Sequence, residues 1–228
     1  MVTSAQSSIA TVAFQRGSLR ALLSICILLI VGNVMSGGWQ VAIKSELGAL
    51  ELSSFVCLSF AALIGCSFHK SGLVRLWAIP YVFAFLALRE MDFQNWWFDP
   101  GLLRTEIFSA PVPIWQKLVS ASAMGVIAIT LISLLVNGAR PFLSALFQGD
   151  TWALILAASG VFVSLSLVLD GVEANLSAIG LTLAPAALTV ASYMEEIMEF
   201  GFAFSLVAAL VVFVRSQIDP HRRPLRTI

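Results

Sequence analysis

Long runs of apolar side chains dominate this sequence, and they constrain its fold more than any other feature. A helix that crosses the hydrocarbon core of a bilayer, about 30 Å thick, needs about 20 mostly apolar residues. Six stretches meet or approach that length. They are residues 19–42, 50–68, 73–88, 117–136, 151–169 and 192–214. The sequence therefore predicts an all-α polytopic membrane bundle with six transmembrane helices.

The composition agrees with this class of protein. Hydrophobic residues make up 59% of the 228 residues and charged residues only 11%, whereas soluble domains carry about 25% charged residues. The spans leave no room for a separate soluble domain, so residues 1–228 are expected to form a single transmembrane domain in contact with the lipid bilayer. The formal net charge of zero argues against nucleic acid as a partner.

Two predicted spans have local features that affect their interpretation. Arg16 and Arg20 precede the apolar run 21–34, which resembles a signal peptide. Apolar character resumes at residues 37–43 without an A-x-A site, which favours an uncleaved helix and leaves cleavage as the alternative. In the third span, Pro80 is expected to kink the helix, as membrane bundles tolerate.

Two connections are expected to contain short helices. One runs from the Asp99-Pro100 pair to Phe108, because aspartate followed by proline is a common helix start. The other, residues 139–147, follows Asn137-Gly138 and is expected to lie at the membrane interface.

The three cysteines give little information about function. Cys26, Cys57 and Cys66 all lie in apolar runs, and none belongs to a CxxC pair. An odd number cannot be fully paired within one chain. They are interpreted as buried packing thiols.

The charged residues orient the predicted bundle. With the N-terminus in the cytoplasm, nine of the 13 lysines and arginines lie on the cytoplasmic side and four lie outside. The acidic residues divide in the opposite way, with two inside and eleven outside. Because cytoplasmic connections are enriched in lysine and arginine, both termini are expected in the cytoplasm.

Three predicted helices bring acidic residues to the same outer level. The apolar run 200–214 supplies only 15 residues, about 22 Å of helix. Glu199 is therefore expected inside the hydrocarbon edge, with Glu195 and Glu196 near the boundary. The third span likewise runs out of apolar residues at its outer end, and Glu51 opens the second.

These acidic residues form the candidate site. One arginine cannot neutralise so many carboxylates, so some must hold a proton, be hydrated in an outward-facing cleft, or bind a cation. Carboxylate oxygens suit a hard divalent cation such as Ca²⁺, Mg²⁺ or Mn²⁺. The alternative is that they are ordinary solvated acids, or acids that favour a helix N-terminus. The predicted ligands are Glu90, Asp92, Glu195 and Glu199, with Glu51 and Glu196 in support and Arg89 as the internal counter-ion.

Two short motifs carry a resemblance. Leu88-Arg89-Glu90-Met91-Asp92-Phe93-Gln94 and Glu195-Glu196-Ile197-Met198-Glu199 resemble the RExDF-like and EExxE-like motifs of uncharacterised bacterial multi-pass inner-membrane proteins. The resemblance extends from about Glu51 to Gly201. It implies a bacterial inner (plasma) membrane protein in which the acidic layer is a shared feature, and it implies no activity.

The leading functional hypothesis is an outward-facing carboxylate site that binds a cation or exchanges protons. The first alternative is a structural or assembly subunit of a larger membrane complex, with other membrane subunits or further copies of this chain as partners. The second is a metal-assisted hydrolase that acts on a lipid-linked substrate at the outer leaflet. No catalytic residue can be assigned, because the sequence contains no GxSxG, HExxH or P-loop motif.

Overall fold

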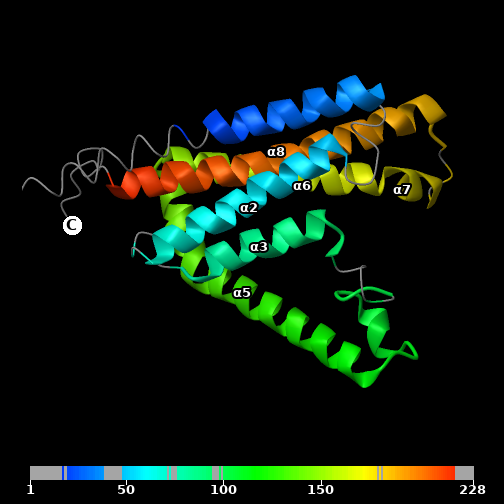
Figure 1. The fold of residues 1–228 in the computed structure, drawn as a ribbon, viewed down its shortest axis with the longest axis horizontal. Helices are drawn as coiled ribbons and strands as arrows, with labels where there is room; N and C mark the ends of the chain where they lie inside the picture. Colours follow the sequence, from blue (N-terminus) through cyan, green and yellow to red (C-terminus); the bar gives the residue numbers. More distant parts are fainter. Residues whose placement is uncertain are drawn as a thin grey trace, which may run out of the picture.

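The computed structural model shows an all-α protein, which confirms the predicted fold class. It describes residues 17, 20–38, 48–70, 72, 76–93, 98, 100–178, 180 and 182–218. In chain order, the elements in Figure 1 are the N-terminal helix Arg20–Gly38, α2 (Ala49–Lys70), α3 (Ala78–Glu90), the 3₁₀ helix η1 (Thr105–Phe108), α5 (Ile114–Phe147), α6 (Thr151–Asp170), α7 (Val172–Ala178) and α8 (Pro185–Ile218).

Within the described residues, five helices are long and apolar enough to cross a membrane: the N-terminal helix, α2, α5, α6 and α8. Their length and composition indicate a multi-pass membrane protein. The counterpart of the predicted span 73–88 is α3, which has 13 residues and is about 20 Å long. Residues 73–75 lie outside the described part of the chain. The count of six crossings and the cytoplasmic position of both termini stay predictions.

One predicted boundary is wrong, and one predicted kink has no structural need, because proline does not break a helix at every position. The structure has no separate helix over 139–147, since α5 continues unbroken to Phe147 with Pro141 inside it. That proline removes one backbone hydrogen bond, a loss that membrane helices tolerate. Pro80 is the third residue of α3, where a missing N–H costs nothing because the first turn has no intrahelical acceptor for it. The expected kink there is therefore unnecessary.

The connection after the third helix is also different from the prediction. Of the short helix expected from Asp99-Pro100 to Phe108, only the last turn forms, as η1. Asp99 itself lies outside the described residues. After α6, the short helix α7 is followed by the start of α8 at Pro185, seven residues before the predicted start.

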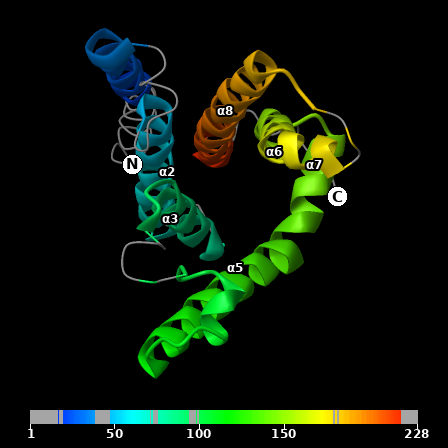
Figure 2. The same ribbon diagram turned by 90° about the vertical axis from the view of Figure 1, so that its right-hand side faces the viewer.

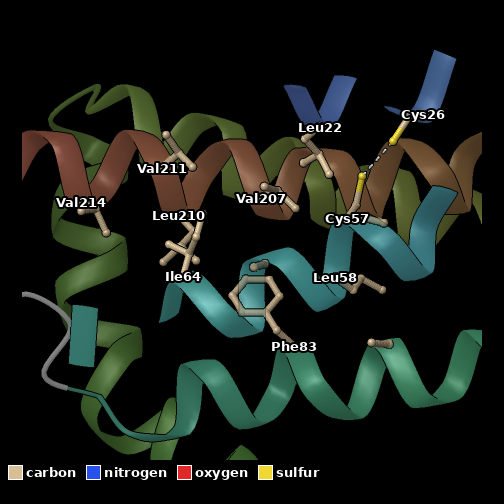
Figure 3. Close-up of a cluster of buried hydrophobic side chains, with 13 residues drawn as sticks. Leu22, Cys26, Cys57, Leu58, Ile64, Phe83, Val207, Leu210, Val211 and Val214 are labelled. Carbon is tan, nitrogen blue, oxygen red and sulfur yellow. Dashed lines mark hydrogen bonds between the residues drawn. The ribbon is translucent and has the colours of Figure 1, made fainter. Parts of the chain in front are cut away.

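The buried core lies between the N-terminal helix, α2, α3 and α8. Figure 3 shows side chains from these four helices pointing toward one another. The core comprises Leu22, Cys26, Cys57, Leu58, Ala61, Ile64, Phe83, Ala87, Ala203, Val207, Leu210, Val211 and Val214. Close packing is essential here, because in lipid the helices gain little from hiding apolar surface and associate largely through van der Waals contact.

Small residues permit the closest helix contacts. A Cβ atom on Gly65 of α2 would lie 3.2 Å from the Cβ of Pro80 on α3. A Cβ on Gly201 of α8 would lie 3.5 Å from the ring of Phe162 on α6. Glycine at these positions lets the α2–α3 and α6–α8 pairs approach closely.

Two helices are attached to this core by small contact areas. In the described N-terminal helix, Leu22 and Cys26 are the buried residues. In α5, the buried residues are Ser120, Thr130 and Ala145. Figures 1 and 2 show α5 meeting α3 and α6 at one end of the bundle and diverging from α3 toward the other. Most of α5 is therefore exposed to its surroundings.

The two ends of the bundle differ in charge. Glu51 lies in the first turn of α2, Glu90 ends α3 and Asp170 ends α6, at the right-hand side of Figure 1. We call this the acidic end. Lys70 and Arg215 lie in the last turns of α2 and α8, at the opposite end, which we call the basic end.

Candidate functional site

Glu199 is the residue at which three helices meet. The Nη2 atom of Arg89, on α3, donates a hydrogen bond to Glu199 Oε1 at 3.2 Å and forms an ion pair with it. The hydroxyl of Ser166, on α6, donates to the same oxygen at 3.3 Å. Ser166 is buried, with 2% of its surface exposed. One carboxylate on α8 is thus held by partners on two other helices.

The position of Glu199 along α8 excludes one of the ordinary explanations for it. An acid at a helix N-terminus is stabilised by the helix dipole within the first turn. However, α8 begins at Pro185, about 21 Å along the helix from Glu199. Counted from Arg215 in its last turn, Glu199 lies about 24 Å away, less than the roughly 30 Å of a hydrocarbon core. The depth of Glu199 within the membrane stays a prediction.

Two further carboxylates lie around the same ion pair. The Glu90 side chain is within electrostatic reach of Glu199, Arg89, Glu51 and Glu196. The Glu196 side chain is in turn within reach of Glu199 and Glu51. Like charges at such positions repel, and Arg89 supplies one positive charge against them. Arg89 thus interacts with Glu199 and Glu90, while Glu51 and Glu196 interact electrostatically with Glu90.

The other two predicted ligands lie differently. Glu195 is within electrostatic reach of Asp170, at the end of α6, as well as Glu199. Asp92 follows the end of α3 and is exposed, with a left-handed backbone φ of 47°. Aspartate is one of the few residues that adopt this conformation readily. Its backbone N–H donates to the carbonyl of Arg89 at 3.0 Å, which closes the last turn of the helix.

The predicted divalent-metal site is not seen as a preformed arrangement. In the part of the chain that the structure describes, no group of three or more histidine, cysteine, aspartate or glutamate residues could hold a metal ion. The ligand set Glu90, Asp92, Glu195 and Glu199 therefore stays a prediction. The observed geometry is one of pairwise contacts centred on Glu199.

Sequence reasoning missed Ser166. This residue belongs to the apolar run of α6, where serine commonly hydrogen-bonds within its own helix, as Ser164 does with the Gly160 carbonyl at 2.8 Å. Its contact with Glu199 depends on the register between α6 and α8, for which the sequence has no local signal.

Sequence reasoning also missed a cysteine pair. Cys26 and Cys57 are both buried, and their sulfur atoms lie 3.6 Å apart, as the dashed line in Figure 3 marks. The Cys26 Sγ atom also lies 4.0 Å from the Ser53 carbonyl oxygen. Cys66 is exposed, so the prediction of three buried thiols is wrong for that residue. The pair joins the N-terminal helix to α2.

The fold and these contacts define a multi-pass helical membrane protein with an inter-helix Arg–Glu–Ser contact near its acidic end. No protein-family model matches the chain, and no curated protein or solved structure is detectably similar to it. The resemblance to bacterial inner-membrane proteins with RExDF-like and EExxE-like motifs stays a prediction.

Proposed function

We propose that this membrane protein takes up and releases a proton, or a cation in its place, through a carboxylate site at the acidic end. The observation that carries the proposal is the three-helix contact of Glu199 with Arg89 and Ser166. This contact supports a polar site between α3, α6 and α8. Ionisable residues inside membranes are costly and usually functional.

The balance of charge supports proton exchange. Arg89 is paired with Glu199, while Glu90 and Glu196 lie within reach of that carboxylate and of Glu51. Two unit charges of the same sign 4 Å apart repel by about 4 kcal/mol at an effective dielectric constant of 20. Holding a proton in the group removes part of this repulsion. Protonation and release would then change how tightly α2, α3 and α8 approach one another.

Proton exchange requires less rearrangement than binding of a hard divalent cation. Ca²⁺ takes six to eight oxygen ligands and Mg²⁺ about six. Oε1 of Glu199 already accepts two hydrogen bonds, and the described residues contain no ready set of metal ligands. Cation binding is the variant of the proposal that elemental analysis of the purified protein would reveal.

The orientation forms part of the proposal. We place the acidic end outside and the basic end, with both termini, in the cytoplasm of a bacterial inner membrane. The basic end carries Lys70, Arg140 and Arg215, as cytoplasmic ends commonly do. The site then exchanges protons with the outer compartment.

Infrared difference spectroscopy of the full chain in nanodiscs tests the proposal. We expect a carboxyl C=O band that persists at neutral pH in the wild type and is lost in the double variant E90Q/E196Q. The matched control is E173Q, which changes an exposed acid of α7 near the same end. Ordinary exposed glutamates titrate near pH 4.3, so a wild type without any protonated carboxyl at neutral pH would refute proton exchange. Elemental analysis of the same samples tests cation binding. A stoichiometric divalent ion that is present in the wild type and absent from the double variant would show cation binding in place of proton exchange.

The second candidate function is a subunit of a larger membrane complex, which the position of α5 favours. Its exposed apolar side chains extend along the helix from Ile114 to Val136, and it diverges from α3 (Figure 2). Such a helix offers a long face to another membrane helix. Purification in a mild detergent tests this candidate, and a stoichiometric partner that is lost when Leu131 on α5 is changed to tryptophan would support it.

A further inference from the structure

A pair of buried thiols, which the carboxylate site does not involve, joins the N-terminal helix to α2. The sulfur atoms of Cys26 and Cys57 lie 3.6 Å apart within the core shown in Figure 3. A disulfide bond is about 2.05 Å long, so the two sulfurs have to approach by about 1.5 Å to form one. Small rotations of both side chains supply a shift of this size, because each sulfur is attached directly to its Cβ atom. The pair is therefore placed to form a disulfide between two helices that are distant in sequence.

The N-terminal helix has a small contact with the rest of the bundle. Leu22 and Cys26, one helical turn apart, are the buried residues in its described part, and the residues after Cys26 are exposed or half-buried. Segments with few buried contacts separate from a structure at a low cost in free energy. Separation of this helix exposes both thiols, and a disulfide between them prevents the separation. The chemical state of the pair thus determines how firmly the helix is attached.

A buried hydroxyl lies beside the two sulfurs. Ser53 is fully buried, and in the part of the chain that the structure describes its Oγ atom has no hydrogen-bond partner. Ser53 precedes Cys57 by four positions on α2, so the two side chains share a helix face. Its carbonyl oxygen lies 4.0 Å from the Cys26 Sγ atom. A buried hydroxyl without a partner is costly, and it gains one when a neighbouring sulfur acquires an oxygen atom, as in a sulfenic acid.

We infer that a hydroperoxide oxidises Cys26 and Cys57 to a disulfide, and that this bond fixes the N-terminal helix to the bundle. In the first step, one thiol takes the terminal oxygen of the hydroperoxide ROOH, which gives a sulfenic acid and the alcohol ROH. In the second step, the other sulfur attacks the sulfenic sulfur, the S–S bond forms and water leaves. The hydroperoxide accepts two electrons, and the two thiol hydrogens leave in the alcohol and the water. The inference is independent of the carboxylate site.

The surroundings of the pair select an organic hydroperoxide that dissolves in the bilayer. The N-terminal helix and α2 are both long and apolar enough to cross a membrane. Cys26 and Cys57 both belong to the apolar core. Hydrogen peroxide is strongly hydrated and is costly to transfer into such surroundings, whereas an organic hydroperoxide carries an apolar group that favours them. The structure provides Ser53 as the hydrogen-bonding group for the sulfenic acid that either reagent forms.

The first experiment measures the rate of disulfide formation in the full chain in nanodiscs. The reduced protein is treated with cumene hydroperoxide or hydrogen peroxide at equal concentration, and alkylation followed by peptide mass spectrometry gives the bridged fraction. We expect cumene hydroperoxide to react at least about fivefold faster than hydrogen peroxide. Ser53→Ala should slow the reaction about fivefold, as expected for the loss of one hydrogen bond. The matched control is Ser159→Ala, which removes the hydroxyl of a buried serine of α6 that donates to the Leu156 carbonyl.

The second experiment measures whether the disulfide fixes the helix. Spin labels are attached through p-acetylphenylalanine at Met35 and Leu63, which are exposed residues of the N-terminal helix and α2. Double electron–electron resonance then gives the distribution of distances between the labels. We expect this distribution to narrow at least about twofold on oxidation and to broaden again after reduction by dithiothreitol. Cys66→Ser, which keeps both buried thiols, should respond as the wild type, and Cys57→Ser should not respond.

Three results would overturn the inference. The first is a wild type in which neither hydroperoxide forms the Cys26–Cys57 disulfide, and the second is a disulfide that leaves the distance distribution unchanged. The third is a reaction with hydrogen peroxide as fast as that with cumene hydroperoxide, which would contradict a bilayer-dissolved oxidant. Equal rates in S53A and S159A would contradict the part assigned to Ser53. Should C57S fail to fold, reduction of the oxidised wild type gives the same comparison on a chain that keeps all three cysteines.

Discussion

Replacing Arg89 with glutamine should destabilise the protein more than replacing its partner, Glu199. In R89Q, the carboxylates of Glu199 and Glu90 lose the positive charge beside them. In E199Q, the amide oxygen can still accept the hydrogen bonds of Arg89 and Ser166, and one negative charge is removed from a group of like charges. The two substitutions therefore affect the local charge balance in opposite directions, although both break the same ion pair.

The size of the effect follows from the geometry. Two unit charges 3.2 Å apart attract by about 1.3 kcal/mol in bulk water and about 5 kcal/mol at an effective dielectric constant of 20. Because 51% of the Arg89 side chain and 29% of the Glu199 side chain are exposed, the lower end of this range applies, about 1 kcal/mol. The repulsion left among the carboxylates adds to the cost, so R89Q should lose about 1–2 kcal/mol in the free energy of unfolding. E199Q should change it by less than about 0.5 kcal/mol.

Reversible unfolding by sodium dodecyl sulfate in mixed micelles measures these free energies. A double-mutant cycle with R89Q/E199Q isolates the coupling between the two residues, expected at about 1 kcal/mol and smaller at high salt. R104Q is the control, because Arg104 is an exposed arginine of the connection near the same end. Equal losses in R89Q and E199Q with zero coupling would refute the reasoning.

Two further predictions concern the packing of the helices. Gly65→Leu should destabilise the bundle by 1 kcal/mol or more, because a Cβ there already meets Pro80 at 3.2 Å, whereas Gly125→Leu, which has open space, should cost little in the same unfolding assay. Copper phenanthroline applied to membranes should cross-link Cys26 to Cys57, whose sulfurs are 3.6 Å apart, and peptide mass spectrometry should show the bridge while the exposed third cysteine stays available for alkylation. If Cys26 and Cys57 do not form a disulfide under these conditions, the N-terminal helix does not pack on α2 as described.

The sequence was sufficient to predict the general fold. The lengths of the apolar runs predict six spans. For five of them, the described residues form helices long and apolar enough to cross a membrane. The third predicted span starts before α3, which begins at Ala78, and residues 73–75 lie outside the described part of the chain. The sequence-based prediction also ended the helix at Asn137-Gly138, whereas α5 continues to Phe147. Glycine and proline break helices in water, but a membrane helix tolerates them.

The candidate site was predicted in part. Counting back from Arg215 predicts the depth of Glu199, and the structure adds that both residues belong to one continuous helix, α8. The contact of Glu199 with Arg89 and Ser166 was not predictable, because it depends on how α3, α6 and α8 are placed relative to one another. The same holds for Cys26 and Cys57, whose pairing depends on the register of two helices that are distant in sequence.

If α3 makes the third crossing that the sequence predicts, its short length has a consequence for the lipid around it. A helix of 13 residues leaves roughly 10 Å of an average hydrocarbon core unmatched, whereas its neighbour α8, at 34 residues, exceeds the full thickness. Mismatch of this kind is relieved by local thinning of the bilayer, at a cost of fractions of a kcal/mol per Å. The membrane should therefore dip on the α3 side and draw lipid headgroups toward Arg89, so that this face would favour thin, short-chain bilayers.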